Sequence, residues 1–250
     1  MASVTPSNSF IKQLAANDRP TRDKALESLR AYLAARQTPF SDVELLKLWK
    51  GLFYCMWMSD RPRTQQRLAI DMAGLVDGIG KEDFLPWMDA FWKTMSREWM
   101  GIDVLRMDKF LFLIRQYLAA SFRYLARQSW KDTGLVGQYM DILAETPLNP
   151  PDAKIPNGLR FHVLDIYVDE LDKIDADREG DLPLKTLLWP LQRLEENSPV
   201  KLVRTRAKEA LNDERLKDWN GKREDASNGT RTAEDVDDAE DDGEWGGFED

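Results

Sequence analysis

Apolar residues recur with a helical period through almost the whole chain, and this pattern restricts the possible folds more than any other feature. Residues 41–58 open with a capping box made by Ser41 and Glu44. One apolar face follows, made of Leu45, Trp49, Leu52, Phe53, Met56 and Trp57. Further helices are expected at 62–80, 81–100 (with Pro86 in the first turn), 101–127, 132–144, 158–175, 183–196 and 198–211. Since no alternating run with flanking turn signals occurs, the sequence predicts an all-α fold.

Two similar tetrapeptides indicate how these helices are arranged. Asn17-Asp18-Arg19-Pro20 and Ser59-Asp60-Arg61-Pro62 each precede an amphipathic helix, and they lie 42 residues apart. A period of about 40–47 residues with two helices per unit is typical of HEAT and armadillo repeats. We therefore expect residues 1–220 to form a HEAT/armadillo-like solenoid of paired antiparallel helices. Its core is expected to contain Trp49, Phe53, Trp57, Phe110 and Ile114.

The last segment, 221–250, differs sharply from the rest in composition. Residues 224–250 hold twelve Asp and Glu against a single basic residue, Arg231, so the acidity of the chain is concentrated there. With so few apolar residues this segment cannot offset its ordering entropy, and we expect a disordered acidic tail. Trp245 and Phe248 are the large aromatic residues in it. They are either chance residues of a solvated tail or a short motif that binds a basic partner.

The chain offers few groups for catalysis or for metal binding. Cys55 is the only cysteine and His162 the only histidine, and both lie in apolar helical segments where a structural role is expected. Asp175 to Gly180 resembles the start of a calcium loop, but Thr186 stands where a bidentate Glu is required, which favours a helix start. Asp165, Asp169 and Asp172 are expected to form a solvated acidic helix face. We therefore expect a protein that is not an enzyme and needs no cofactor or metal.

The composition also bears on the compartment. With one cysteine the chain cannot form an internal disulfide, which favours the cytosol or the nucleus. The first ten residues lack the basic and apolar regions of a secretory signal, and no apolar run approaches the roughly 20 residues of a membrane span.

Basic residues gather in two places that could contact RNA or an acidic partner. Within the helix expected at 101–127, Arg106, Lys109, Arg123 and Arg127 fall within about 100° around the axis. Near the end of the helical region stand Lys201, Arg204, Arg206 and Lys208. Both groups are either solvated polar faces or contacts for RNA phosphates or acidic protein surfaces.

Several blocks of the sequence resemble one family. Residues 48–60, Leu-Trp-Lys-Gly-Leu-Phe-Tyr-Cys-Met-Trp-Met-Ser-Asp, are similar to the signature block of the ribosomal RNA-processing protein 1 family. Residues 108–110, 121–125 and 158–167 resemble its later blocks, in the same order. The similarity covers roughly residues 8–215.

This resemblance implies a nuclear, nucleolar scaffold of large (60S) ribosomal subunit assembly. Such a factor rides on early pre-60S particles and supports processing of precursor RNA that contains the spacer between 5.8S and 25S/28S rRNA. The implied partners are pre-60S assembly factors and ribosomal proteins, with possible direct pre-rRNA contact, and no membrane or small-molecule substrate is implied. The resemblance adds no catalytic residue, and the short acidic tail departs from the extended basic C-terminal regions of longer relatives. The alternative is a helical-repeat adaptor that binds only proteins and acts outside ribosome assembly.

Overall fold

The computed structural model describes residues 8–127, 129–178 and 182–219, and within these ranges it contains helices and no strand. Short 3-10 helices follow α4 (η1) and α5 (η2). The bounds are α1 (Asn8–Leu14), α2 (Arg19–Ala35), α3 (Asp42–Trp57), α4 (Pro62–Ala73), η1 (Gly74–Gly78), α5 (Lys81–Glu98), η2 (Trp99–Gly101), α6 (Val104–Ala126), α7 (Thr133–Glu145), α8 (Asn157–Ile174), α9 (Leu184–Asn197) and α10 (Lys201–Leu211). The predicted tail at 221–250, with Trp245 and Phe248, lies outside the described residues.

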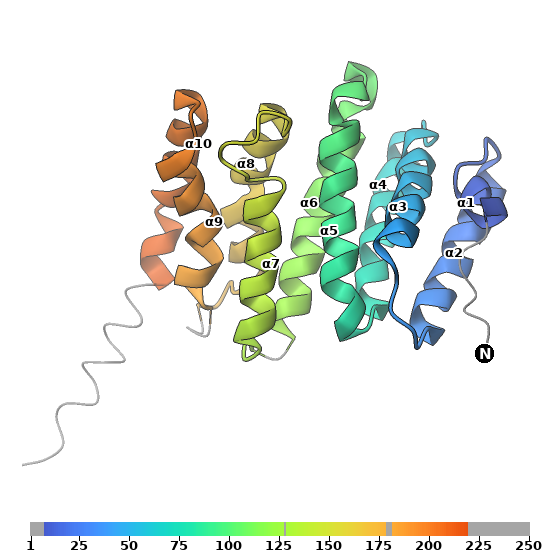
Figure 1. Cartoon of the computed structure of the whole chain (residues 1–250), viewed down its shortest axis with the longest axis horizontal. Helices are drawn as coiled ribbons and strands as arrows, with labels where there is room; N and C mark the ends of the chain where they lie inside the picture. The colour runs from blue at the N-terminus through green and yellow to red at the C-terminus, as the bar shows by residue number, and fades with distance from the viewer. Residues whose placement is uncertain (1–7, 128, 179–181, 220–250) are drawn as a thin grey trace, which may run out of the picture.

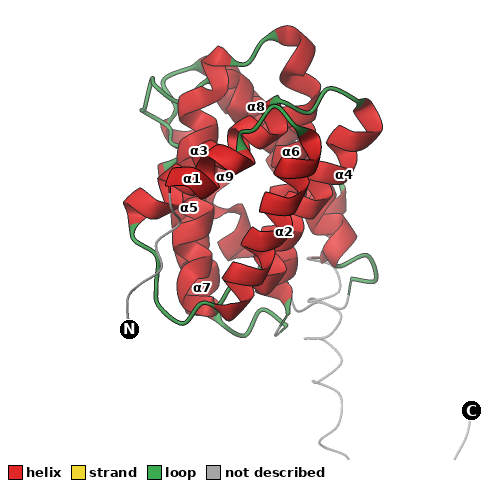
Figure 2. Ribbon diagram, turned by 90° about the vertical axis from the view of Figure 1, so that its right-hand side faces the viewer, coloured by secondary structure: helices red, strands yellow, loops and turns green. Residues whose placement is uncertain are grey.

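Consecutive helices run in opposite directions, and the resulting pairs stack side by side from α1–α2 to α9–α10 (Figure 1). The odd-numbered helices form one layer, in which α1, α3, α5, α7 and α9 contact one another in that order. The even-numbered helices form the second layer, as the view along the stack shows (Figure 2). The predicted all-α solenoid of paired antiparallel helices is therefore confirmed. Among the described helices, none is both long and apolar enough to cross a membrane.

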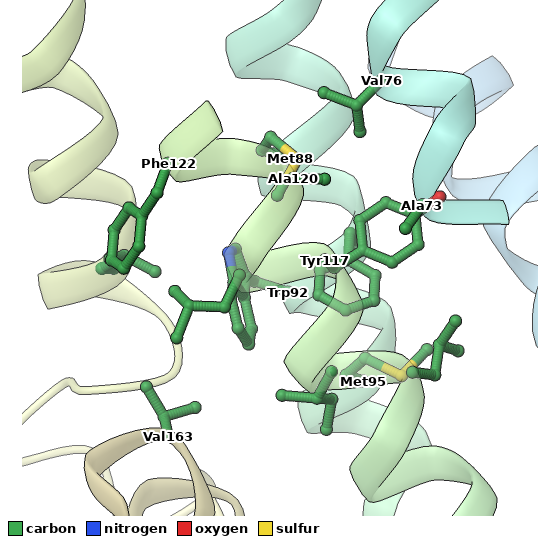
Figure 3. Close-up of a cluster of buried hydrophobic side chains, with 14 of the residues drawn as sticks. Ala73, Val76, Met88, Trp92, Met95, Tyr117, Ala120, Phe122 and Val163 are labelled. Atoms are coloured by element: carbon green, nitrogen blue, oxygen red, sulfur yellow. The ribbon is translucent and has the colours of Figure 1, made fainter. Parts of the chain in front are cut away.

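A cluster of buried hydrophobic side chains, with Trp92, Tyr117 and Phe122 among them, fills the space between the two layers in the middle of the stack (Figure 3). Trp49 of α3 is fully buried, and its ring centroid lies 5.1 Å from that of Trp87, 4.9 Å from Phe91 and 4.9 Å from Tyr117. Because Tyr117 belongs to α6 and the other two rings to α5, this one cluster joins two neighbouring helix pairs.

The polar atoms of buried aromatic residues also bond across the boundaries between pairs. The indole of Trp49 donates to the carbonyl of Trp87 at 3.1 Å, which joins α3 to α5. The hydroxyl of Tyr117 donates to the carbonyl of Met72 at 2.7 Å, and that of Tyr167 to the carbonyl of Leu187 at 2.6 Å. A buried hydroxyl or indole N–H without a partner would be costly, so these bonds fix how each pair sits on the next.

Most predicted boundaries are confirmed to within a few residues. The capping box at the start of α3 is present, with the amide of Ser41 donating to Glu44 at 2.9 Å. The helix predicted at 62–80 instead changes at Gly74 into the 3-10 turn η1. α1 was not predicted from the sequence, because seven residues are too few for a clear period.

Two predictions about single residues are wrong. Pro86 is the sixth residue of α5 and not part of its first turn, because the helix already begins at Lys81. Trp57 is half-buried and not a core residue. It ends α3 at the edge of the stack, where its ring packs near Phe53 and beneath the guanidinium of Arg106, 4.8 Å from the ring centroid. The other four predicted core residues, Trp49, Phe53, Phe110 and Ile114, are buried.

A recurring feature of the even-numbered helices is a donor at the fourth position that holds the preceding turn. We call these residues the turn donors: Arg22 of α2, Gln65 of α4, Arg160 of α8 and Arg204 of α10. Arg22 donates to the carbonyls of Ala16, Asn17 and Met58, and Gln65 donates to that of Ser59. Arg160 donates to the carbonyls of Asn149, Asp152 and Ile155, and Arg204 to that of Ser198. These bonds satisfy carbonyl groups that helix ends and turns leave open.

Candidate interaction surfaces

The basic residues predicted on one side of α6 are divided by the structure into different environments. Arg106 pairs with Asp103 and covers the ring of Trp57. Arg127, at the C-terminal end of the helix, pairs with Asp77 and lies 4.7 Å from the ring centroid of Tyr124. Arg123 is exposed and has no ion-pair partner among the described residues. Arg123 and Arg127 are therefore placed where a partner could reach them.

The prediction of an exposed basic surface is wrong for Lys109, because its side chain is buried. The residue is only 5% exposed, and its ammonium donates to the carbonyls of Trp57 at 2.6 Å and Ser59 at 2.7 Å. Burial, reinforced by the nearby charge of Arg106, lowers the pKa of Lys109 to about 8. Lys109 thus caps the C-terminal end of α3, where carbonyl groups favour a cation, and it cannot reach an RNA phosphate.

The basic residues of α10 lie at the far end of the stack. Lys201 and Lys208 are exposed and form no ion pair with any described residue. Arg204 is the turn donor of α10, and its guanidinium donates to the carbonyl of Ser198 at 2.7 Å. Arg206 lies 3.5 Å from Asp165 and 3.3 Å from Glu209, so its charge is shared with carboxylates. Of this group the two lysines offer the least compensated positive charge.

Of the acidic residues predicted on α8, Asp165 is exposed and lies 3.5 Å from Arg206, whereas Asp169 and Asp172 are half-buried and ion-paired. Asp169 is bridged by Arg115 of α6 at 2.8 Å and by Arg215 at 3.0 Å, and Asp172 pairs with Arg178. Burial opposes ionisation of Asp169, but hydrogen bonds from Arg215 and Arg115 hold its pKa below the ordinary value. These carboxylates therefore bind the C-terminal segment after α10 to the even-numbered layer.

The single histidine and the single cysteine of the chain both take part in the packing of the helices. His162 is half-buried, its Nε2 lies 2.8 Å from the carbonyl of Leu111, and burial lowers its pKa. Cys55 is buried in α3, and burial raises the pKa of its thiol to about 12. A nucleophilic cysteine needs the opposite shift and access to solvent.

The calcium-like segment is also used by the fold as far as the structure describes it. The carboxylate of Asp175 accepts from the indole of Trp219 at 2.6 Å. The segment continues through residues 179–181, which lie outside the described ranges, and α9 then begins at Leu184. Among the described residues, no three His, Cys, Asp or Glu side chains gather into a metal site.

An exposed apolar cluster at the turn between α5 and α6 escaped the sequence analysis. Met100 is 82% exposed, Val104 87% and Leu105 93%. The signal was available, because Val104 and Leu105 directly follow the N-cap Asp103 and so fill the first two helical positions, which point away from the core. Exposed apolar groups gathered in one place are typical of contact surfaces.

Comparison with known proteins gives these surfaces a context. The sequence model of the family described as nucleolar protein, Nop52, matches residues 5–246. The chain is 44% identical over 170 residues to human ribosomal RNA processing protein 1 homolog B, covering 66% of this chain and 22% of that protein. It is 41% identical over 178 residues to mouse ribosomal RNA processing protein 1 homolog A, covering 69% of this chain and 36% of that protein. A homolog from Dictyostelium discoideum is 26% identical over 212 residues, which are 76% of this chain and 42% of the relative. The chain thus spans less than half the length of these relatives.

Proposed function

Since the chain belongs to the Nop52 family of nucleolar proteins, we propose that it is a non-catalytic scaffold factor of large (60S) ribosomal subunit assembly. In this role it supports pre-rRNA processing in the nucleolus and binds pre-60S assembly factors and ribosomal proteins. The names of the relatives support the part of the proposal that concerns ribosomal RNA processing. The solenoid supports the scaffold role, because stacked helix pairs expose two long layers to partners while each pair packs mainly against its neighbours.

The observation that carries the non-catalytic reading is that the groups best suited to chemistry are engaged in packing. Cys55 is buried with a raised pKa, His162 contacts a backbone carbonyl, and Asp169 is bridged by two arginines. Each of these groups joins two elements of the stack or lies between them. Such placements serve the fold, because Cys55 is closed off from solvent and the polar atoms of His162 and Asp169 are already bonded within the protein.

Sedimentation of the tagged full chain from a nuclear extract tests the main proposal. The chain should co-sediment with pre-60S particles, and its depletion should cause precursors containing the spacer between 5.8S and 25S/28S rRNA to accumulate. If the chain stays in the light fractions and precursor levels do not change, the proposal is wrong. The remaining reading would then be a helical-repeat adaptor outside ribosome assembly.

The exposed basic residues are the proposed contacts with pre-rRNA or an acidic partner. A variant with Arg123, Arg127, Lys201 and Lys208 all changed to Gln should associate with particles more weakly and lose association at lower salt. The matched control changes four exposed lysines elsewhere to Gln, namely Lys24, Lys47, Lys50 and Lys185. Equal behaviour of the two variants would contradict this assignment. Arg106 and Lys109 are left out because their side chains also stabilise the fold.

The tail motif stays a separate proposal, because Trp245 and Phe248 lie outside the described residues. In this proposal the two aromatic side chains insert into a groove of a basic partner, while the surrounding carboxylates steer the encounter. Changing both to Ala should reduce recovery of one particular partner and leave particle association intact. If removal of residues 224–250 changes the recovery of no partner at any salt concentration, the motif has no role.

A further inference from the structure

The two tetrapeptides that suggested the repeat meet in the structure around one pocket. The turn between α1 and α2 and the turn between α3 and α4 lie in adjacent pairs at the same edge of the stack (Figure 1). Between them is a pocket of about 380 Å³, lined on one side by Asn17, Arg19 and Arg22 and on the other chiefly by Ser59, Arg61 and Thr64. Residues 42 positions apart in the sequence thus face the same space.

Positive charge at this pocket is only partly compensated. Arg22 is buried, and its guanidinium is held by backbone carbonyls with no carboxylate within 4.0 Å among the described residues. Arg61 is exposed and likewise has no ion-pair partner in the described part of the chain. Arg19 shares its charge with Asp23 at 3.2 Å, and Asp60 is the acidic residue among those that line the pocket. The lining therefore holds three arginines against one aspartate, an arrangement that favours an anion.

Hydrogen-bond donors without partners among the described residues lie at the same turn. Helix α4 begins here with Pro62, and no side chain caps its N-terminus, so the amides of Arg63 and Thr64 have no partner within the helix. Ser59 is only 2% exposed and lines the pocket, yet its hydroxyl has no hydrogen-bond partner among the residues that the structure describes. A buried hydroxyl without a partner is rare in folded proteins and calls for an explanation. An anion in the pocket would supply acceptors for the hydroxyl and the amides together.

We propose that this pocket binds a phosphodiester group of an RNA strand, an inference that rests on the proposed function for its choice of ligand. The exposed guanidinium of Arg61 and that of Arg19 neutralise the phosphate charge. The hydroxyl of Ser59 and the amide of Thr64 donate to phosphate oxygens at the start of α4, where the helix dipole favours negative charge. Arg22 contributes its charge from the buried side of the pocket. Its hydrogen bonds to the carbonyls of Asn17 and Met58 hold the two turns together.

The test uses the purified full chain and a fluorescently labelled single-stranded RNA of about 16 nucleotides. Arg61→Gln should weaken binding about tenfold at low salt, a loss of about 1.4 kcal/mol. It should also reduce the slope of log affinity against log salt by about 0.7, the value for one phosphate contact on a single strand. Ser59→Ala should weaken binding too, while the melting temperature stays unchanged or rises, because the hydroxyl has no partner within the described part of the chain. Lys24→Gln, which removes an exposed charge of α2 outside the pocket, is the control and should bind RNA as the wild type does.

The outcomes separate this inference from the proposed function. If the wild type binds RNA and Arg61→Gln and Ser59→Ala bind it equally well, the pocket is not the RNA site. If the wild type binds no RNA at low salt, the inference is also wrong, whereas co-sedimentation with pre-60S particles can still hold through protein contacts. A phosphoserine peptide that binds more tightly than the RNA, with the same dependence on Arg61 and Ser59, would overturn the choice of ligand.

Discussion

The turn donors predict a graded loss of stability that depends on how many hydrogen bonds each residue makes. Arg160 is buried and makes four bonds, to the carbonyls of Asn149, Asp152 and Ile155 and to the side chain of Asn157. Arg204 is half-buried and makes one, to the carbonyl of Ser198. Both occupy the fourth position of an even-numbered helix, so the two sites share their place in the turn and differ in the number of bonds and in burial.

The magnitudes follow from that difference. At about 1 kcal/mol for each hydrogen bond, Arg160→Met should cost about 4 kcal/mol and Arg204→Met about 1 kcal/mol. Methionine keeps most of the length of the arginine stem, so a cavity contributes little to either value. For a chain of this size the melting temperature should fall by about 8–16 °C in the first variant and by about 2–4 °C in the second.

Urea unfolding followed by circular dichroism measures both variants against the wild type. The midpoint should move while the dependence of free energy on urea stays the same, which shows that the unfolded states are comparable. Burial lowers the pKa of Arg160, and the nearby charge of Asp152 opposes this shift only in part. Arg160→Met therefore also removes a charge that is costly to bury, which offsets part of the stability lost with the hydrogen bonds. If Arg160→Met and Arg204→Met cost the same within about 0.5 kcal/mol, counting hydrogen bonds does not describe these turns.

Three further predictions concern the core and its titrating groups. Phe110→Ala should cost about 3–5 kcal/mol in urea unfolding, because Phe110 is fully buried and stacks on Phe53 at 4.7 Å; a loss below about 1 kcal/mol would contradict its place in the core. Cys55 should react with iodoacetamide at pH 8 only when the chain opens, so that the labelling rate, followed by mass, rises with urea, and rapid labelling without urea would refute its burial. As pH rises from about 8 to 9 the folded chain releases the proton of Lys109 while the unfolded chain keeps it. The wild type should therefore gain stability relative to Lys109→Met over this window, and a constant difference between them would contradict the lowered pKa.

The helices were predictable because each carries its own signal. α3 combines the Ser41–Glu44 capping box with a continuous apolar face, and both are local properties of the sequence. Pairing also followed from local information, since short polar turns separate helices of similar length. α1 has only seven residues and depends on contact with α3, where Ile11 and Leu14 approach Gly51 so closely that an added Cβ would lie 3.1 Å from Ile11. No periodic pattern reports such a contact between elements.

The candidate surface was less predictable, because a helical projection shows the angle of a residue but not what lies opposite. Lys109 and Arg127 have the same angle around α6, yet Lys109 faces the end of α3 whereas Arg127 lies near the other end of the helix. The turn donors were missed for a related reason. An arginine at the fourth position of a helix looks like a surface charge in the sequence, and only the path of the preceding turn brings carbonyl groups within its reach.

The position of the buried cations also decides how the proposed RNA contacts must be tested. Arg22 and Lys109 both bind carbonyls of the segment from Trp57 to Ser59, so the positive charge that holds the α3–α4 turn lies directly beside the pocket. Removing either residue would weaken RNA binding even if neither touched RNA, because the turn that carries Arg61 would lose its support. Loss of binding is therefore informative only for residues whose removal does not lower the unfolding free energy. Arg61 meets that condition, since its side chain makes no ion pair within the described chain, and its substitution separates recognition of RNA from stability of the fold.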